Sequence, residues 1–331
     1  MHPLNYIDIM IKCGVEEYMS RAIPLLPLEK FTVTSVSSPE EVHEFCLEKF
    51  GMTPHFMMAV LSKGLPNDLH MGIEWDYDPK YGEWAALTIS VRNKKNKLVA
   101  RDYRLVDEES KKTWPGDLHV DASLSGQGIG TLLAFNQMRL INHMGVPKML
   151  IKAGDVTGAA FWGRLGFDLE NEQALLHFNK KILAKRLEIM SGFLGEDFVH
   201  HAYEACEALD RGSVWPLTDL DQDIITFYKK DKTMTMLRMM NEEYVDITVG
   251  EVTVREAVLS AGALARFENR GVITLGQVLL VGQQWYGVFD FSSQRQLDRL
   301  ALNVSAPLGI TPDESVVQQA PPKLHRRFRL G

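Results

Sequence analysis

A glycine-rich run between a strand-like segment and a helix-like segment constrains this chain more than any other feature. The run reads SGQGIG at residues 125–130, and every second residue of it from Gly126 onward is glycine. Alternating apolar residues precede it at 118–124, and a largely apolar helical segment begins near Thr131. Because glycine has no Cβ, such a turn can adopt positive φ and approach a ligand closely. The N–H groups at the start of the helix point into the turn. We therefore expect the turn to bind a phosphate-bearing cofactor through main-chain groups, without a basic side chain.

The residues after the turn continue the same unit. The helix is expected to end at Gly145, and a strand at 149–152 and a short helix at 158–165 follow it. The polar surface of the long helix is expected to come from Asn136, Gln137, Arg139, Asn142 and His143. The stretch 117–167 thus alternates strand, glycine turn, helix, strand and short helix.

Before this unit the chain reads mainly as strands, and after residue 180 mainly as helices. We expect strands at 31–36, 70–78, 83–93 and 98–107, and a helix at 39–50 that Ser38 caps; residues 56–61 fit either state. Further helices are expected at 180–194, 199–209, 253–270 and 297–303, with 274–280 between the last two. The expected parts are an N-terminal helical extension (1–30), a central domain (31–180), a helical bridge (181–245), a small helical module (246–312) and a flexible basic tail (313–331).

Composition narrows the class of protein. A net charge of −7 does not indicate global attraction to nucleic acid or to an anionic membrane, and no apolar run of about 18 residues predicts a membrane span. The three cysteines, Cys13, Cys46 and Cys206, form neither a disulfide framework nor a zinc pattern, and they suit a reducing compartment. We therefore expect a cytoplasmic protein without a metal. The basic end of the tail is the one segment that could touch nucleic acid or an acidic partner, with a solvated tail as the alternative.

The central stretch resembles the GCN5-related N-acetyltransferase (GNAT) superfamily. Gly128 and Gly130 match the two small positions of the acetyl-CoA motif of that superfamily, while Ser125 stands where arginine or glutamine is usual. The segment Leu118-His119-Val120 matches the Leu-x-Val strand that precedes the motif, and FWGRLGF at 161–167 matches its aromatic-Tyr-x-x-x-Gly-Phe terminus. The resemblance covers about residues 31–180. It implies an α/β (α+β) fold with a mixed, mostly antiparallel sheet flanked by helices. The C-terminal helical module is expected beyond that fold.

The resemblance also implies which residues meet the cofactor, acetyl-CoA, which serves as a co-substrate. The residues carried over as cofactor-binding are Leu118, Val120, Ser125, Gly126, Gln127, Gly128, Ile129, Gly130, Thr131, Asp155, Phe161 and Trp162. Besides Ser125, two of these depart from the pattern: Asp155 stands where many members carry asparagine, and Trp162 stands where many carry a tyrosine that can protonate the leaving thiolate.

The implied reaction is direct attack of an amine on the acetyl thioester. The protein must hold the two reactants together, remove a proton from the ammonium and stabilise the oxyanion with a main-chain N–H group. The candidate bases are His119, Asp121 and Glu74, with Asp117 and Asp76 as further possibilities. A solvated strand face is the alternative for each of them. We expect an amine acceptor, carried by a protein or another macromolecule, and no metal.

A weaker resemblance concerns residues 246–310. The sequences VREAVLSAGALARFENRGVITLGQVLL and FSSQRQLDRLALNVSAPLGI look like the C-terminal domain of the bacterial RNA polymerase alpha subunit. The positions that contact DNA in that domain fall here on Gly262 and Ala265, and only Arg295 remains basic. The second hypothesis is therefore a CoA-binding interaction or scaffolding protein with a degenerate active site, linked to transcription through this module.

Overall fold

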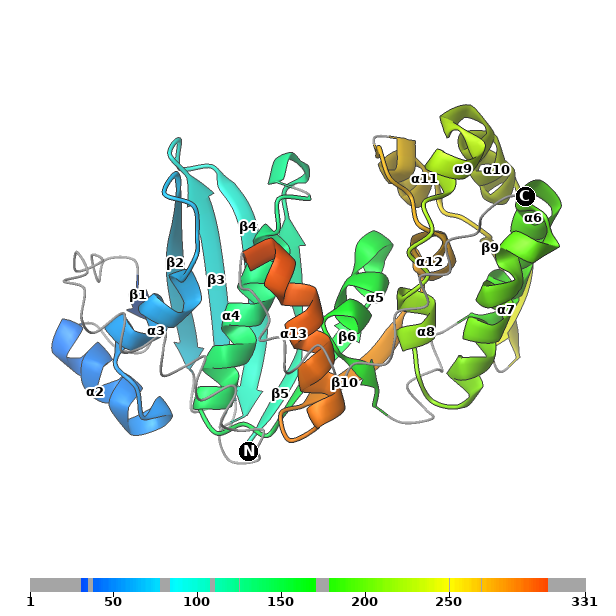
Figure 1. Ribbon diagram of the computed structural model, residues 1–331. Helices are drawn as coiled ribbons and strands as arrows, with labels where there is room; N and C mark the ends of the chain where they lie inside the picture. The colour runs from blue at the N-terminus through cyan, green and yellow to red at the C-terminus, as the bar shows by residue number, and fades with distance from the viewer. Residues whose placement is uncertain are drawn as a thin grey trace.

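The computed structural model describes residues 31–34, 38–77, 84–107, 111–124, 126–170, 179–249, 251–268 and 270–308 (Figure 1). The expected N-terminal extension, Ser125 and the basic tail at 313–331 lie outside the described residues.

An eight-stranded sheet organises the molecule. Its strands are β1 (Phe31–Val33), β2 (Leu69–Tyr77), β3 (Trp84–Asn93), β4 (Leu98–Asp107), β5 (Lys112–Val120), β6 (Lys148–Ala153), β7 (Asp168–Leu169) and β10 (Trp285–Asp290). Their order across the sheet is β1-β2-β3-β4-β5-β6-β10-β7. The pairs β1–β2 and β5–β6 are parallel, and the other pairs are antiparallel. The expected α/β class, with a mostly antiparallel sheet flanked by helices, is confirmed.

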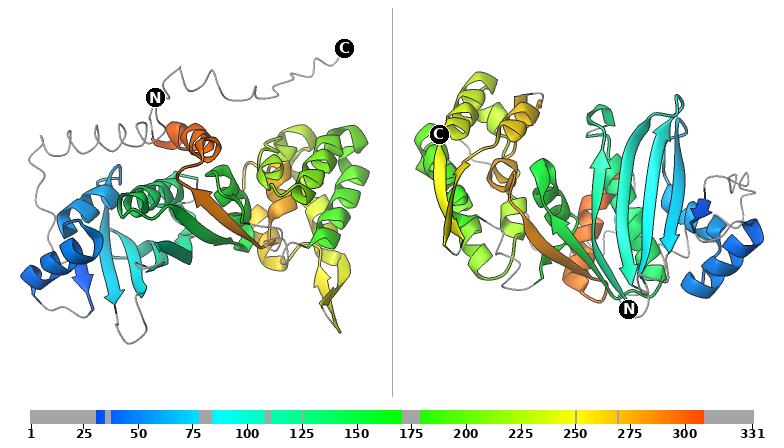
Figure 2. Two further views of the ribbon diagram at one scale, coloured as in Figure 1. Left: turned by 90° about the horizontal axis from the view of Figure 1, so that it is seen from below. Right: turned by 180° about the vertical axis from the view of Figure 1, so that it is seen from behind.

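Helices cover the sheet. They are α2 (Pro39–Phe50), α3 (Pro54–Ser62), α4 (Ile129–His143), α5 (Asp155–Arg164) and α13 (Gln294–Leu308). The helices α4 and α13 lie in front of the sheet in Figure 1 and behind it in the right panel of Figure 2. The ambiguous residues 56–61 belong to α3, because Thr53 caps that helix and Asn136 of α4 donates to the carbonyls of Leu61 and Lys63 at its end.

A second lobe, which we call the inserted lobe, lies between β7 and β10 in the chain and beside that edge of the sheet in space (Figures 1 and 2). It consists of α6 (Lys180–Leu194), α7 (Glu196–Asp210), α8 (Trp215–Thr218), α9 (Ile224–Tyr228), α10 (Lys230–Glu242), β8 (Tyr244–Val249), β9 (Val252–Ala257), α11 (Ala261–Glu268) and α12 (Leu275–Leu280). The strands β8 and β9 form a separate two-stranded sheet.

The C-terminal part of the chain is organised differently from the expectation. Residues 246–308 do not form one small helical module, because β10 pairs with both β6 and β7 in the main sheet and α13 packs against α4 and α5. The helix expected at 253–270 is wrong over its first half, where β9 precedes the shorter α11. The physical reason is that alternate residues of β10, Trp285 and Phe289 among them, complete the core of the main sheet.

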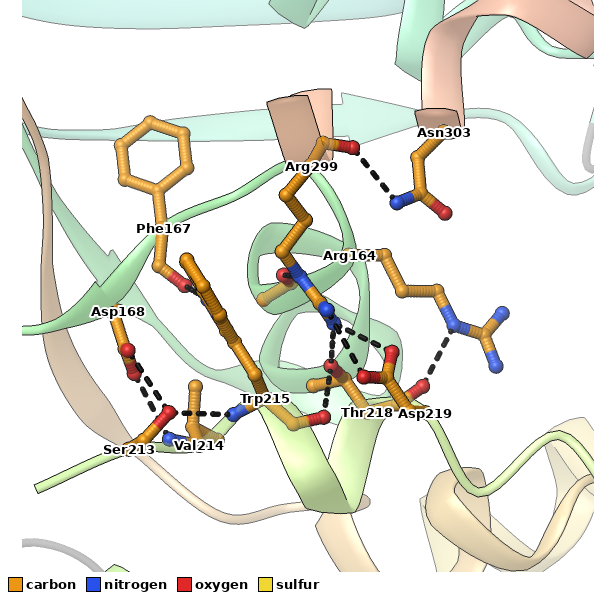
Figure 3. A network of polar contacts seen from close by, with 11 residues as sticks. Arg164, Phe167, Asp168, Ser213, Val214, Trp215, Thr218, Asp219, Arg299 and Asn303 are labelled. Carbon is orange, nitrogen blue, oxygen red and sulfur yellow. Dashed lines mark hydrogen bonds and ion pairs between the residues drawn. The ribbon is translucent and has the colours of Figure 1, made fainter. Parts of the chain in front are cut away.

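Polar contacts join the inserted lobe to the sheet domain (Figure 3). Arg299 of α13 donates through Nε to the carbonyl of Gly163 in α5 at 2.8 Å, and through Nη1 and Nη2 to the carboxylate of Asp219 at 2.9 and 2.7 Å. The indole N–H of Trp215 in α8 donates to the carbonyl of Phe167 at 2.7 Å. These contacts tie α5, α13 and α8 into one connected structure.

Candidate functional site

The parallel strands β5 and β6 meet at one point and then diverge. Their ladder pairs only Lys112 with Lys148. Just beyond this pair, side chains replace the ladder. The N–H of Leu150 donates to Oγ1 of Thr113 at 3.0 Å, and Nη1 of Arg104 donates to the carbonyl of Leu150 at 3.0 Å. Beyond Leu150 the described residues of the two strands form no further pair. We call this feature the β5–β6 divergence.

A β-bulge in β5 explains the divergence. The register of β4 and β5 passes from Tyr103↔Asp117 to Leu105↔Trp114, so that two residues of β5, at positions 115 and 116, oppose the single residue Arg104. Gly116 is required there, since a Cβ would lie 1.4 Å from the carbonyl oxygen of Tyr103. The other residue is a proline, which has no N–H to donate. Because a bulge bends its strand and increases the local twist, β5 turns away from β6 beyond this point.

The divergence leaves main-chain groups of β5 without a strand partner. The N–H of Asp121 donates to the carbonyl of Val99 in β4 at 2.8 Å, so His119 and Asp121 direct their main chains toward β4. Main-chain direction alternates along a strand, and Leu118 and Val120 therefore direct theirs toward β6. No β6 residue pairs with them in the described ladder. These are the main-chain groups that the family resemblance assigns to the cofactor.

The glycine turn lies at the end of β5. Gly126 and Gly128 have φ of 79° and 78°, in the left-handed region that glycine tolerates best. Gly128 is the N-cap of α4, no side chain caps that helix end and no acid lies in its first turn. A Cβ on Gly130 would stand 3.5 Å from Cγ2 of Val120, so the helix start packs closely against the end of β5. The side chain of Gln127 points back into the turn, where its Nε2 donates to the carbonyl of Ser123.

Both aromatic residues carried over from the family lie on α5, beside the divergence. Phe161 is half-buried, and it is the side chain of α5 nearest to Gly130. Trp162 is buried, and its ring makes edge contacts with Phe161 and Phe167 at centroid distances of 5.0 and 5.2 Å. Trp162 thus packs in the core. Asp155 is the first residue of α5 by its main chain, and its side chain lies outside the described residues.

Of the candidate bases, Glu74 lies far from His119. Glu74 and His119 are exposed on the sheet face opposite α4. The register places Glu74 in one row with Thr88, Tyr103 and Asp117, so that three strand spacings, about 14 Å, separate the main chains of Glu74 and β5. Of the acids weighed from the sequence, Asp117 is therefore the one that shares β5 with His119.

Asp121 has a local structural role. Its carboxylate accepts from Nζ of Lys97 at 2.8 Å and from Oγ and the N–H of Ser123 at 2.7 and 2.9 Å. These hydrogen bonds from Lys97 and Ser123 hold the pKa of Asp121 well below its ordinary value. A carboxylate stabilised in this way is a poor general base.

The structure also reveals a buried polar cluster that the sequence did not indicate. Asp102 and Arg104, on the face of β4 that meets α4, are fully buried, and Nε of Arg104 donates to Oε1 of Gln137 at 2.8 Å. Among the described residues, both carboxylate oxygens of Asp102, Nη2 of Arg104 and Nε2 of Gln137 have no hydrogen-bond partner. Burial raises the pKa of Asp102 to about 6 against the lowering effect of Arg104, and burial lowers the pKa of Arg104.

Three polar residues of α4 differ from their expected placement. Asn136, Gln137 and Arg139, expected on a polar surface, are buried. The first two use that position to bond α3 and Arg104. One pattern could have indicated the burial of Asp102 and Arg104: these opposite charges stand two residues apart, between the apolar Ala100 and Val106 on the same strand face.

Comparison with known proteins gives no match: no protein-family model, no curated protein and no solved structure is significantly similar to this chain. Within the described ranges, no group of three or more metal-ligating side chains is placed to hold a metal ion. The described helices include none with the length and apolar character needed to cross a membrane.

Proposed function

We propose that this protein is an N-acyltransferase that transfers an acetyl group from acetyl-CoA to an amine. The observation that carries the proposal is the β5–β6 divergence, because it stands directly beside the glycine turn. The diphosphate is assigned to the turn and the uncapped start of α4, where main-chain N–H groups and the helix dipole favour an anion. The pantetheine arm is assigned to the free main chain of Leu118 and Val120, which offers both donors and acceptors.

The acceptor amine is assigned to the open face of the sheet. Asp117 lies there in the same row as Tyr103, and His119 lies two residues further along β5, opposite Arg101. Either side chain can accept a proton from the acceptor's ammonium group, which frees the amine that attacks, without occupying the cofactor side of the strand.

The inserted lobe supports a macromolecular carrier of that amine. The chain returns from the lobe to the sheet at Trp285, which pairs with Ala153 at the end of β6. This end of β6 is the one farthest from Lys148, where β6 meets β5. The lobe therefore adjoins the proposed site through β10, and it gives the molecule a second surface that an acceptor protein could contact.

The burial of Trp162 favours one alternative, a CoA-binding scaffolding protein. A core tryptophan cannot protonate a leaving thiolate, and a protein that only binds CoA does not need that proton. The two functions differ in one observable, which is whether acetyl groups leave the cofactor.

The proposal is tested by calorimetric titration of CoA and by mass-spectrometric detection of acetyl transfer to a panel of amines and proteins. Gly126→Glu is expected to weaken CoA binding at least tenfold, since a carboxylate enters the diphosphate site. Gly145→Glu is the matched control at the other end of α4, because Gly145 has a similar φ of 74° and, like Gly126, no neighbour within 4 Å of an added Cβ.

Equal CoA affinity in the two variants would refute the assigned site. CoA binding without acetyl transfer to any acceptor would favour the scaffolding alternative.

A further inference from the structure

We propose that Arg104 is a catalytic residue whose guanidinium stabilises the leaving CoA thiolate, in place of the tyrosine that Trp162 replaces. The inference rests on the proposed function, and it assigns a role to a residue that the family pattern does not contain.

The position of Arg104 is the first argument. It is the single residue of β4 that opposes the bulge in β5, and its side chain reaches past β5 to the carbonyl of Leu150 in β6. The guanidinium therefore lies where the two strands begin to separate. An acyl thioester whose arm follows the free main chain of Leu118 toward the bulge would meet this group at the closed end of the divergence.

The orientation of the guanidinium is the second argument. Nε is held by Oε1 of Gln137 at 2.8 Å and Nη1 by the carbonyl of Leu150 at 3.0 Å. Two fixed donors on a planar group determine the direction of the third, and Nη2 has no partner among the described residues although it is fully buried. A buried, positively charged and unused donor is costly unless something accepts from it.

The third argument is the neighbour of this group. Cζ of Arg104 lies 5.9 Å from the ring centroid of Trp162, at the family's tyrosine position. The cation is thus placed beside the side chain that would otherwise supply the acid. Asp102, on the same strand face and also without a hydrogen-bond partner, supplies the opposite charge that makes burial of the arginine tolerable.

The chemical step is balanced without any further reagent. The amine nitrogen forms a bond to the acetyl carbonyl carbon and passes its proton to a base on the open face. The C–S bond then breaks, and its electron pair stays on sulfur as the CoA thiolate. Arg104 keeps its proton and donates a charge-assisted hydrogen bond from Nη2 to that sulfur, and the thiolate takes a proton from water after release.

The experiment uses the full chain and free CoA as the probe. The pKa of the bound CoA thiol is measured from the ultraviolet absorbance of its thiolate as pH rises, for the wild type, Arg104→Gln and Arg104→Lys. The wild type is expected to lower the thiol pKa relative to CoA in solution, and Arg104→Gln to return it toward the solution value with little change in CoA affinity. Arg104→Lys keeps the positive charge but loses the planar guanidinium group. The pKa of the CoA thiol bound to it is therefore expected to lie between the values for the wild type and Arg104→Gln.

Kinetics give a second readout. Where acetyl transfer is measurable, Arg104→Gln is expected to lower kcat on the order of 100-fold with a smaller change in KM, as for the loss of one buried donor to a developing negative charge. A wild-type bound thiol that titrates like CoA in solution would overturn the inference without reference to any variant, and so would equal thiol pKa values in the wild type and a folded Arg104→Gln. Failure of the proposed function is a different result, namely a wild type that does not bind CoA.

Discussion

Stability should depend on pH in a way that Asp102 controls. Its pKa is raised from the ordinary value of 3.8 to about 6 because the carboxyl group is fully buried, an effect that the charge of Arg104 only partly offsets. Between these two pH values the native protein holds a proton that the unfolded chain has released. The free energy of unfolding must then fall as pH rises from about 4 to about 6, and level off above that. A shift of about two units corresponds to a loss of about 3 kcal/mol.

The assay is urea unfolding of the wild type and Asp102→Asn at closely spaced pH values from 4 to 8. The asparagine variant cannot ionise, so the difference between the two unfolding free energies should change by about 3 kcal/mol across the window and stay constant above it. The absolute stability of the variant is also affected by the loss of the counter-charge for Arg104, which is why the comparison uses the change with pH. Two curves that run parallel from pH 4 to 8 would refute the buried, ionisable placement of Asp102.

Two further predictions concern residues that hold the fold. Arg186→Met should lower the free energy of unfolding by about 3 kcal/mol, because it leaves without a donor the carbonyls of Val258 and of three residues at the end of α12, to which the buried guanidinium donates. In the same urea titration Lys185→Met, which removes only an exposed ion pair, should leave the midpoint nearly unchanged, and equal effects would contradict the assignment. Gly116→Ala should destabilise the protein by about 3 kcal/mol or more and abolish CoA binding, since the added Cβ collides with the main chain of β4. The control is Gly262→Ala in α11, where an added Cβ has open space, and it should raise the urea midpoint slightly. A Gly116→Ala variant that keeps its stability and its CoA binding would show that the bulge does not create the divergence.

Local patterns in the sequence predicted the parts of the fold that depend on local chemistry. The capping box at the start of α2 is an example: Oγ of Ser38 accepts from the N–H of Glu41, and the Glu41 carboxylate accepts in return from the N–H of Ser38. The glycine turn before α4 is another, because its positive φ values require glycine wherever the turn occurs.

The parts that were missed depend on long-range pairing. The strand β10 pairs with β6, more than 130 residues earlier in the chain, and six residues with a glycine among them carry little evidence of that partner. The same limit applies to the site. Four polar residues follow one another in β4, from Arg101 to Arg104, so neither face of this stretch is apolar. Which charges face inward becomes clear only when α4 supplies Gln137 as a partner for Arg104. Asp121 appeared to be a candidate base because its partner Lys97 stands 24 residues earlier in the chain, in the turn before β4.

The central claim is that acetyl-CoA binds between the glycine turn and the divergent strands. Hydrogen–deuterium exchange with and without acetyl-CoA, read on peptides that cover residues 118–132 and, as a distant reference, the β8–β9 hairpin at 244–257, tests it most directly. The account predicts slower exchange at 118–132 on addition of acetyl-CoA and no change at the hairpin. Unchanged exchange at 118–132 under saturating acetyl-CoA, or protection confined to the inserted lobe, would contradict it.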